Sequence, residues 1–137
     1  MTRKTIPLLL SLFLLVAAYA QEIKPVDLVK ASLTAYNNVD IDAFISYFSD
    51  GILMKNFNVG KVTAEGKDQV RAIYEPYFKA SPNLYSKIIN RKEFDNKVMD
   101  HEYITGSGGS SEAFEILVIY KIFDGKISSM LAVRKIE

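Results

Sequence analysis

The chain contains no cysteine and no tryptophan, and His101 is its only histidine among 137 residues. Without cysteine there is no disulfide, no thiol nucleophile and no thiolate metal ligand. A lipoprotein with its lipid on a cysteine is also excluded. The neighbours of His101, Asp100 and Glu102, point to the other side of an extended strand, so they cannot join it around a metal. We therefore expect a domain that needs no metal and no cofactor.

The sequence also lacks phosphate-binding and nucleophile motifs. The glycine-rich stretch at residues 106–111 follows one predicted strand and opens another, whereas a nucleotide loop opens a helix. No nucleophile elbow occurs. Because these motifs are absent, we do not expect a protein of the common nucleotide-binding or serine-hydrolase classes.

The only long apolar run lies at the start of the chain, from Ile6 to Ala18. Arg3 and Lys4 precede it, and an Ala-Tyr-Ala triplet ends at Ala20. This order is typical of a cleaved secretory signal peptide. The alternative is an uncleaved membrane anchor, but the run is shorter than the roughly 20 apolar residues of a membrane span. We expect residues 1–20 to be removed and the mature protein to be exported, to the periplasm or outside the cell.

Residues 21–137 are long enough for one domain with its own core. They carry fifteen basic and sixteen acidic side chains, and no basic stripe runs through them. We therefore expect neither nucleic-acid binding nor, after signal cleavage, membrane association. The whole chain has sixteen Phe and Tyr residues, fourteen of them in this domain, which favours a core or a pocket with aromatic walls.

The first half of the domain has the 3.6-residue apolar period of helices. The pattern predicts helices over residues 25–37, 41–48 and 66–80, with short strands at 52–57 and 61–65. Pro25 suits a first helical turn, and Asp40 is a suitable N-cap for the second helix. Pro76 lies inside the third helix and is expected to bend or shorten it.

The second half changes to the two-residue period of strands. It predicts strands at 84–94, 97–106, 112–123 and 126–136, with tight turns at 95–96 and 124–125. Helices followed by a run of antiparallel strands indicate an α+β fold, in which the helices pack on one face of a curved sheet.

The turn at Asp124-Gly125 also predicts which side chains share the other face of the sheet. A two-residue turn there places four apolar residues together on the face away from the helices: Leu117, Ile119, Met130 and Ala132. An apolar centre with a charged rim favours a homodimer interface. The alternative is an ordinary half-solvated sheet face.

Several segments together resemble a known family over residues 25–136. They are Tyr-Asn-Asn-Val-Asp-Ile-Asp-Ala-Phe at 36–44, Tyr-Phe-Ser-Asp at 47–50, Glu-Gly-Lys at 65–67, Val-Met-Asp-His-Glu at 98–102 and Tyr-Lys-Ile-Phe-Asp-Gly-Lys-Ile at 120–127. In order and spacing they resemble the SnoaL-like branch of the nuclear-transport-factor-2-like superfamily. The resemblance implies a cone of three helices and a curved antiparallel sheet around an apolar pocket, usually in a dimer. Members include ketosteroid isomerases, polyketide cyclases, dehydratases and proteins without known activity, so the fold alone does not supply the function.

The residues that carry ketosteroid isomerase chemistry in that family are not matched here. The general-base position falls at Asn56, whose amide cannot take a proton from carbon. The tyrosine and protonated-aspartate positions fall at Ser32 and Val118. Isomerisation of that type is therefore not expected.

His101 is the main candidate for other acid–base chemistry, because histidine titrates near neutral pH. A connection over residues 95–97 pairs Arg91 with His101, and places Tyr103 on the same face. If this face lines the pocket, Arg91, His101 and Tyr103 form a catalytic cluster. The alternative is a histidine on the outer face or in a structural hydrogen-bond network.

Two functions remain open at this point, beside a third possibility, a homodimeric protein-interaction module, which needs the sheet face around Leu117, Ile119 and Met130 to be exposed. The favoured one is binding of a small hydrophobic molecule, with candidate contacts at Asn56, Tyr74, Phe78, Val118 and Tyr120. The other is a cofactor-independent isomerase, cyclase or lyase in which His101 is the general acid or base. The direction of His101 discriminates between them.

Overall fold

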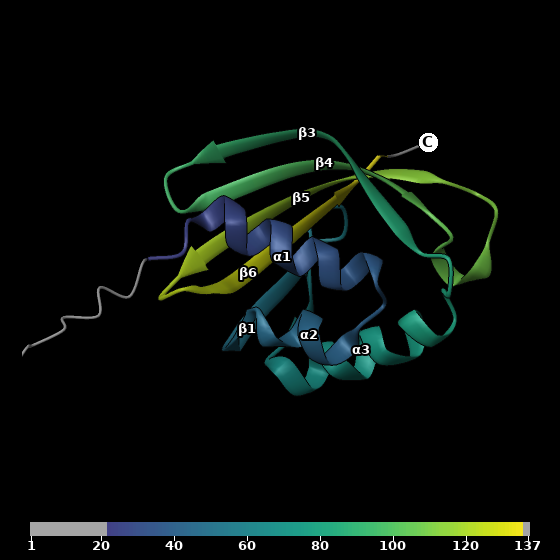
Figure 1. Ribbon diagram of the computed structural model, residues 1–137, viewed down its shortest axis with the longest axis horizontal. Coiled ribbons are helices and arrows are strands. Elements are labelled where there is room, and N and C mark those ends of the chain that lie inside the picture. The colour runs from purple at the N-terminus through teal and green to yellow at the C-terminus, as the bar shows by residue number, and fades with distance from the viewer. Residues whose placement is uncertain (1–21, 136–137) are drawn as a thin grey trace, which may run out of the picture.

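A six-stranded sheet curves over three helices in the computed structural model, which describes residues 22–135 (Figure 1). In chain order the elements are α1 (Pro25–Asn37), α2 (Ile41–Ser46), β1 (Phe48–Asn56), β2 (Lys61–Glu65), α3 (Lys67–Lys79), β3 (Tyr85–Phe94), β4 (Lys97–Thr105), the short 3-10 helix η1 (Ser107–Gly109), β5 (Phe114–Phe123) and β6 (Lys126–Arg134). The predicted signal peptide, its cleavage site and the last residue of the predicted final strand lie outside the described residues.

The strand order in the sheet is β2-β1-β6-β5-β4-β3. All neighbouring strands are antiparallel except β1 and β6, which run parallel. The predicted α+β fold with helices on one face of a curved sheet is confirmed, and the parallel pair makes the sheet mixed. Among residues 22–135, no helix is both long enough and apolar enough to cross a membrane.

The helix boundaries follow from local chemistry. Pro25 begins α1, and the Asp40 carboxylate accepts a hydrogen bond from the Ala43 amide at 3.0 Å, which caps α2. Helix α2 ends two residues before the predicted boundary, because the Tyr47 carbonyl already accepts the Ile127 amide of β6 at 2.9 Å. Phe48 then enters β1 fully buried. Pro76 lies within α3 and does not end it.

A bulge in β6 corrects the predicted face of two residues. The pairs Ile122–Ile127 and Lys121–Ser129 leave Ser128 without a partner, and its hydroxyl donates to the Lys121 carbonyl at 3.1 Å. One extra residue reverses which side chains point to each face beyond it.

Met130 and Ala132 were therefore wrongly predicted on the outer face. Both lie on the helix side of the sheet, and Leu131 and Val133 pair with Ile119 and Leu117 instead.

A second bulge shifts β3 against β4. Ile88 pairs with Glu102 and Asn90 with His101, so Ile89 is left unpaired. The turn between the two strands sets the other change, because Phe94 pairs with Lys97 and the connection is two residues long, not three. Arg91 is therefore opposite Asp100, and the predicted pairing of Arg91 with His101 was wrong. Strand β3 is an edge of the sheet, where such bulges are common.

Candidate functional site

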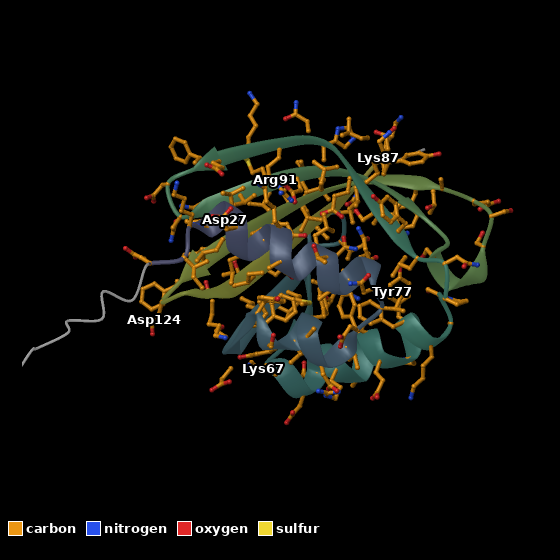
Figure 2. All side chains as sticks on the ribbon, viewed as in Figure 1. Asp27, Lys67, Tyr77, Lys87, Arg91 and Asp124 are labelled. Atoms are coloured by element: carbon orange, nitrogen blue, oxygen red, sulfur yellow. The ribbon has the colours of Figure 1, made fainter. Side chains whose placement is uncertain are left out.

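A cavity of about 260 Å³, open to solvent on one side, lies between the helices and the concave face of the sheet. Helices α1, α2 and α3 supply one wall, strands β4, β5 and β6 supply the other, and Ser107 of η1 lies at its edge. The lining residues are Ser32, Leu33, Tyr36, Phe44, Ile73, Tyr74, Tyr77, Glu102, Ile104, Ser107, Phe114, Ile116, Val118, Tyr120, Met130, Ala132 and Arg134. Figure 2 shows one of them, Tyr77, on the inner side of α3 facing α1.

Six of the lining side chains are aromatic, and those of the three helices pack against one another. The Phe44 ring centroid lies 4.9 Å from that of Tyr74 and 5.8 Å from that of Tyr36. The Tyr77 hydroxyl lies 3.1 Å from that of Tyr36 and donates to the Ser107 hydroxyl at 3.0 Å. Rings held in this way form a wall that exists before any ligand arrives.

Burial keeps the cavity tyrosines uncharged. It is the largest cause that raises the pKa of Tyr74 to about 12, and it raises the pKa of Tyr36 and Tyr120 well above the usual value for tyrosine. These hydroxyls therefore act as hydrogen-bond donors and acceptors at neutral pH, not as bases.

Glu102 is the one carboxyl side chain that lines the cavity among residues 22–135. Only 3 % of the residue is exposed. The Ser86 hydroxyl donates to its Oε2 atom at 2.7 Å, and the Tyr120 hydroxyl donates to its Oε1 atom at 3.1 Å. Burial raises the pKa of Glu102, and these two hydrogen bonds partly oppose that effect.

A buried ion pair lies beside Glu102 on β4. Arg91 donates from Nε and Nη2 to the two carboxylate oxygens of Asp100, both at 2.6 Å. Asp100 is fully buried, and the Arg91 side chain is 15 % exposed. The hydrogen bonds to Asp100 are the main reason that the pKa of Arg91 is raised. Each group therefore has a bidentate partner, which is the geometry that a buried pair requires.

The predicted cluster of Arg91, His101 and Tyr103 does not form around the cavity. His101 lies on the outer face of the sheet, where its Nε2 atom is 2.7 Å from Oε2 of Glu115. Its side chain is 39 % exposed, and Tyr103 on the same face is 41 % exposed. Arg91 points to the other face, toward Asp100. None of the three residues lines the cavity. Their catalytic role therefore stays a prediction, and no contact with the cavity supports it.

Three of the five predicted ligand contacts, Tyr74, Val118 and Tyr120, line the cavity. Phe78 lies in the core behind it, and Asn56 lies at the end of β1, where its side-chain oxygen accepts the Val59 amide at 3.4 Å.

Glu102 was not among the predicted site residues. The sequence held a usable signal, because the alternation of β4 places Asp100 and Glu102 on one face with Val98 and Ile104. Carboxyl groups on the apolar face of a predicted strand indicate a buried, functional or paired group.

The comparisons with known proteins identify the family. A family model described as a SnoaL-like domain matches residues 29–130. The chain therefore belongs to the SnoaL-like domain family, and the predicted membership in the nuclear-transport-factor-2-like superfamily is confirmed. Comparison with curated proteins finds no match.

Solved structures share the fold. An uncharacterized cystatin-fold protein from Novosphingobium aromaticivorans is 26 % identical, with a TM-score of 0.75 over 82 % of this chain and 99 % of its own. An NTF2-like protein of unknown function from Cytophaga hutchinsonii is 16 % identical, with a TM-score of 0.70 over 85 % of this chain and 94 % of its own.

A third structure carries a small molecule. It is a hypothetical protein from Catenulispora acidiphila with a ketosteroid isomerase-like fold, in complex with trimethylamine. It is 15 % identical, with a TM-score of 0.67 over 80 % of this chain and 85 % of its own. At this identity the likeness concerns the fold alone.

Proposed function

We propose that this SnoaL-like domain binds a small, largely apolar molecule in the cavity between the helices and the sheet. The observation that carries the proposal is the cavity itself, with packed aromatic walls and the hydrogen-bonded Glu102 carboxyl among them. Ligand sites are typically apolar, concave and fitted with a few polar groups. At about 260 Å³ the cavity lies near the lower end of ligand-pocket volumes, so we expect the ligand to be small.

The solved relatives are compatible with this proposal. The Catenulispora acidiphila protein was crystallised in complex with trimethylamine, so a fold of this kind can accompany a small organic molecule. The proposal for this chain rests on its own lining residues.

Native mass spectrometry of protein purified from its own host tests the proposal. Ala132 lines the cavity, so Ala132→Phe adds a ring that fills part of it. Val62 is 53 % exposed on β2, so Val62→Phe adds the same ring outside the cavity. We expect a bound molecule in the wild type and in Val62→Phe, and loss of that molecule in Ala132→Phe with the fold retained by circular dichroism. A molecule retained by all three proteins would place the ligand elsewhere.

An enzyme that uses His101 is the second candidate, and the geometry does not favour it. A general base must reach its proton within hydrogen-bond distance, and His101 contacts Glu115 on the other side of the sheet from the cavity. We expect His101→Ala to leave the mass and amount of the bound molecule unchanged. A chemically different bound molecule in that variant would support the hypothesis that the protein is an enzyme that uses His101.

We also propose that the outer sheet face forms a homodimer. Leu117, Ile119, Leu131 and Val133 form adjacent pairs on β5 and β6 and give this face an apolar centre. Leu117 is 37 % exposed. A charged side chain at Leu117 would oppose dimer formation, because burying a charge removes the free energy gained from burying apolar surface. Sedimentation velocity is expected to show a dimer for the wild type and a monomer for Leu117→Glu, whereas a monomeric wild type would end this proposal.

Export is proposed on the sequence of residues 1–20. The intact mass of the protein from its own host is expected to correspond to a chain that begins at Gln21. A mass that includes residues 1–20 would show that the segment is retained.

A further inference from the structure

The buried ionisable groups beside the cavity do not balance in charge. Arg91 and Asp100 neutralise each other through two hydrogen bonds. Glu102 is left over, and no ion pair of the described residues involves it. Its two contacts are with the uncharged hydroxyls of Ser86 and Tyr120. The cluster therefore carries one negative charge whenever Glu102 is ionised, and a buried charge of this kind is costly without a counter-charge.

Among residues 22–135, no cationic side chain that lines the cavity forms an ion pair with Glu102. Arg134 is the one cationic residue among the lining residues, and its guanidinium carbon lies 4.2 Å from the centre of the Phe114 ring. Arg134 is exposed, so water and salt screen its charge far more than they screen that of Glu102. The missing positive charge can come from a proton on Glu102 or from a ligand.

The rest of the wall favours a cationic ligand. Aromatic faces carry negative electrostatic potential and attract ammonium groups, more strongly when water is excluded. Tyr36, Tyr74 and Tyr120 lie close enough to Glu102 for its charge to raise their pKa values. A carboxylate among aromatic rings is complementary to an alkylammonium group in both charge and apolar surface.

We propose that the cavity is a site for a small organic ammonium ion, whose charged nitrogen lies between the Glu102 carboxylate and the surrounding tyrosine rings. This inference rests on the proposed function, because it names the class of molecule that the cavity takes.

Calorimetric titration of ligand-free protein with choline tests the inference. The reference ligand is the uncharged analogue of choline, in which a tert-butyl group replaces the trimethylammonium group. The two molecules have nearly the same shape, so the difference in affinity reports the charge. We expect choline to bind the wild type at least about tenfold more tightly than the analogue.

Two variants locate the effect. Glu102→Gln keeps the size of the side chain and can still bond to Ser86 and Tyr120, but it removes the charge. We expect choline to lose its advantage in this variant and the analogue to bind as before. Glu115→Gln removes a carboxylate from the outer face, where it contacts His101, and is expected to change neither affinity.

The pH dependence gives a further readout. The charged or titratable groups that face Glu102 from the surrounding elements are Asp100 of β4, Arg91 of β3, Tyr120 of β5, Tyr36 of α1 and Tyr74 of α3. The tyrosines stay neutral near pH 7, and Arg91 and Asp100 hold each other. Since choline competes with the proton on Glu102, its affinity is expected to fall with decreasing pH while that of the analogue does not.

Equal binding of choline and its analogue to the wild type would overturn this inference and leave the proposed function standing. Choline that still binds preferentially to Glu102→Gln would also overturn it. If neither ligand binds, the ammonium site is refuted, and the Ala132→Phe comparison by native mass spectrometry decides separately whether the cavity holds another molecule. The wild-type comparison needs no variant, so it remains decisive if Glu102→Gln fails to fold.

Discussion

Loss of Arg91 is expected to be among the most damaging single changes to a polar residue of this domain. Arg91→Met keeps much of the apolar stem but removes both hydrogen bonds to Asp100, whose side chain is fully buried. An unpaired buried carboxylate costs about 3–5 kcal/mol when its partner is removed. Domains of this size are stable by about 5–15 kcal/mol, so a large part of the stability is lost.

Urea denaturation measures this loss. A slope of about 2 kcal/mol/M converts the expected cost into a midpoint lower by about 1.5–2.5 M. The double variant Arg91→Met/Asp100→Leu removes both charges and is expected to be more stable than Arg91→Met alone. Asp100→Asn is expected to cost less than Arg91→Met, because the Arg91 side chain is 15 % exposed and can reach water.

A small effect of Arg91→Met would refute this reasoning. Exposed ion pairs contribute about 0–1 kcal/mol. A loss within that range, or a double variant no more stable than Arg91→Met, would show that Asp100 does not depend on Arg91 for a counter-charge.

The remaining predictions concern a titrating group, a turn and a helix cap. Burial raises the folded-state pKa of Glu102 above its value in the unfolded chain. The wild type is therefore expected to lose stability relative to Glu102→Gln as pH rises through the folded-state pKa. A difference in urea midpoints that does not change with pH would contradict this. Gly106 has φ +71°, and a Cβ there would collide with the Asn83 backbone. Gly106→Ala should therefore lower the melting temperature far more than Gly60→Ala, whose Cβ meets open space at φ +64°; equal shifts would show that the collision is relieved. Asp40→Ala should cost about 1 kcal/mol in thermal unfolding, because it removes the α2 cap, and an unchanged stability would show that the cap contributes nothing.

The sequence was a good guide to the fold because periodicity is set by many residues at once. The stripe along α3 and the alternation of β4 and β5 each persist over nine or more residues, so single exceptions do not hide them. The position of each strand in the chain followed from the turn signals between them.

The site was harder to predict because one-residue differences in turn length and strand register decide which side chains meet. The bulges at Ile89 and Ser128 change the pairing by one residue, and a hydroxyl contact such as that of Ser128 leaves no trace in the apolar period. The two-residue turn at 95–96 pairs Arg91 with Asp100, and the bulge at Ser128 turns Ala132 toward the cavity. His101 therefore has a different neighbour from the predicted one, and the alternation of β4 places Glu102, not His101, on the cavity side.

A crystal structure of the protein with its bound molecule tests the central claim most directly. The account predicts electron density for the molecule inside the cavity, in contact with Tyr74, Tyr120 and the Glu102 carboxyl. Density on the outer face of the sheet beside His101 and Glu115, with the cavity filled only by water, would contradict it.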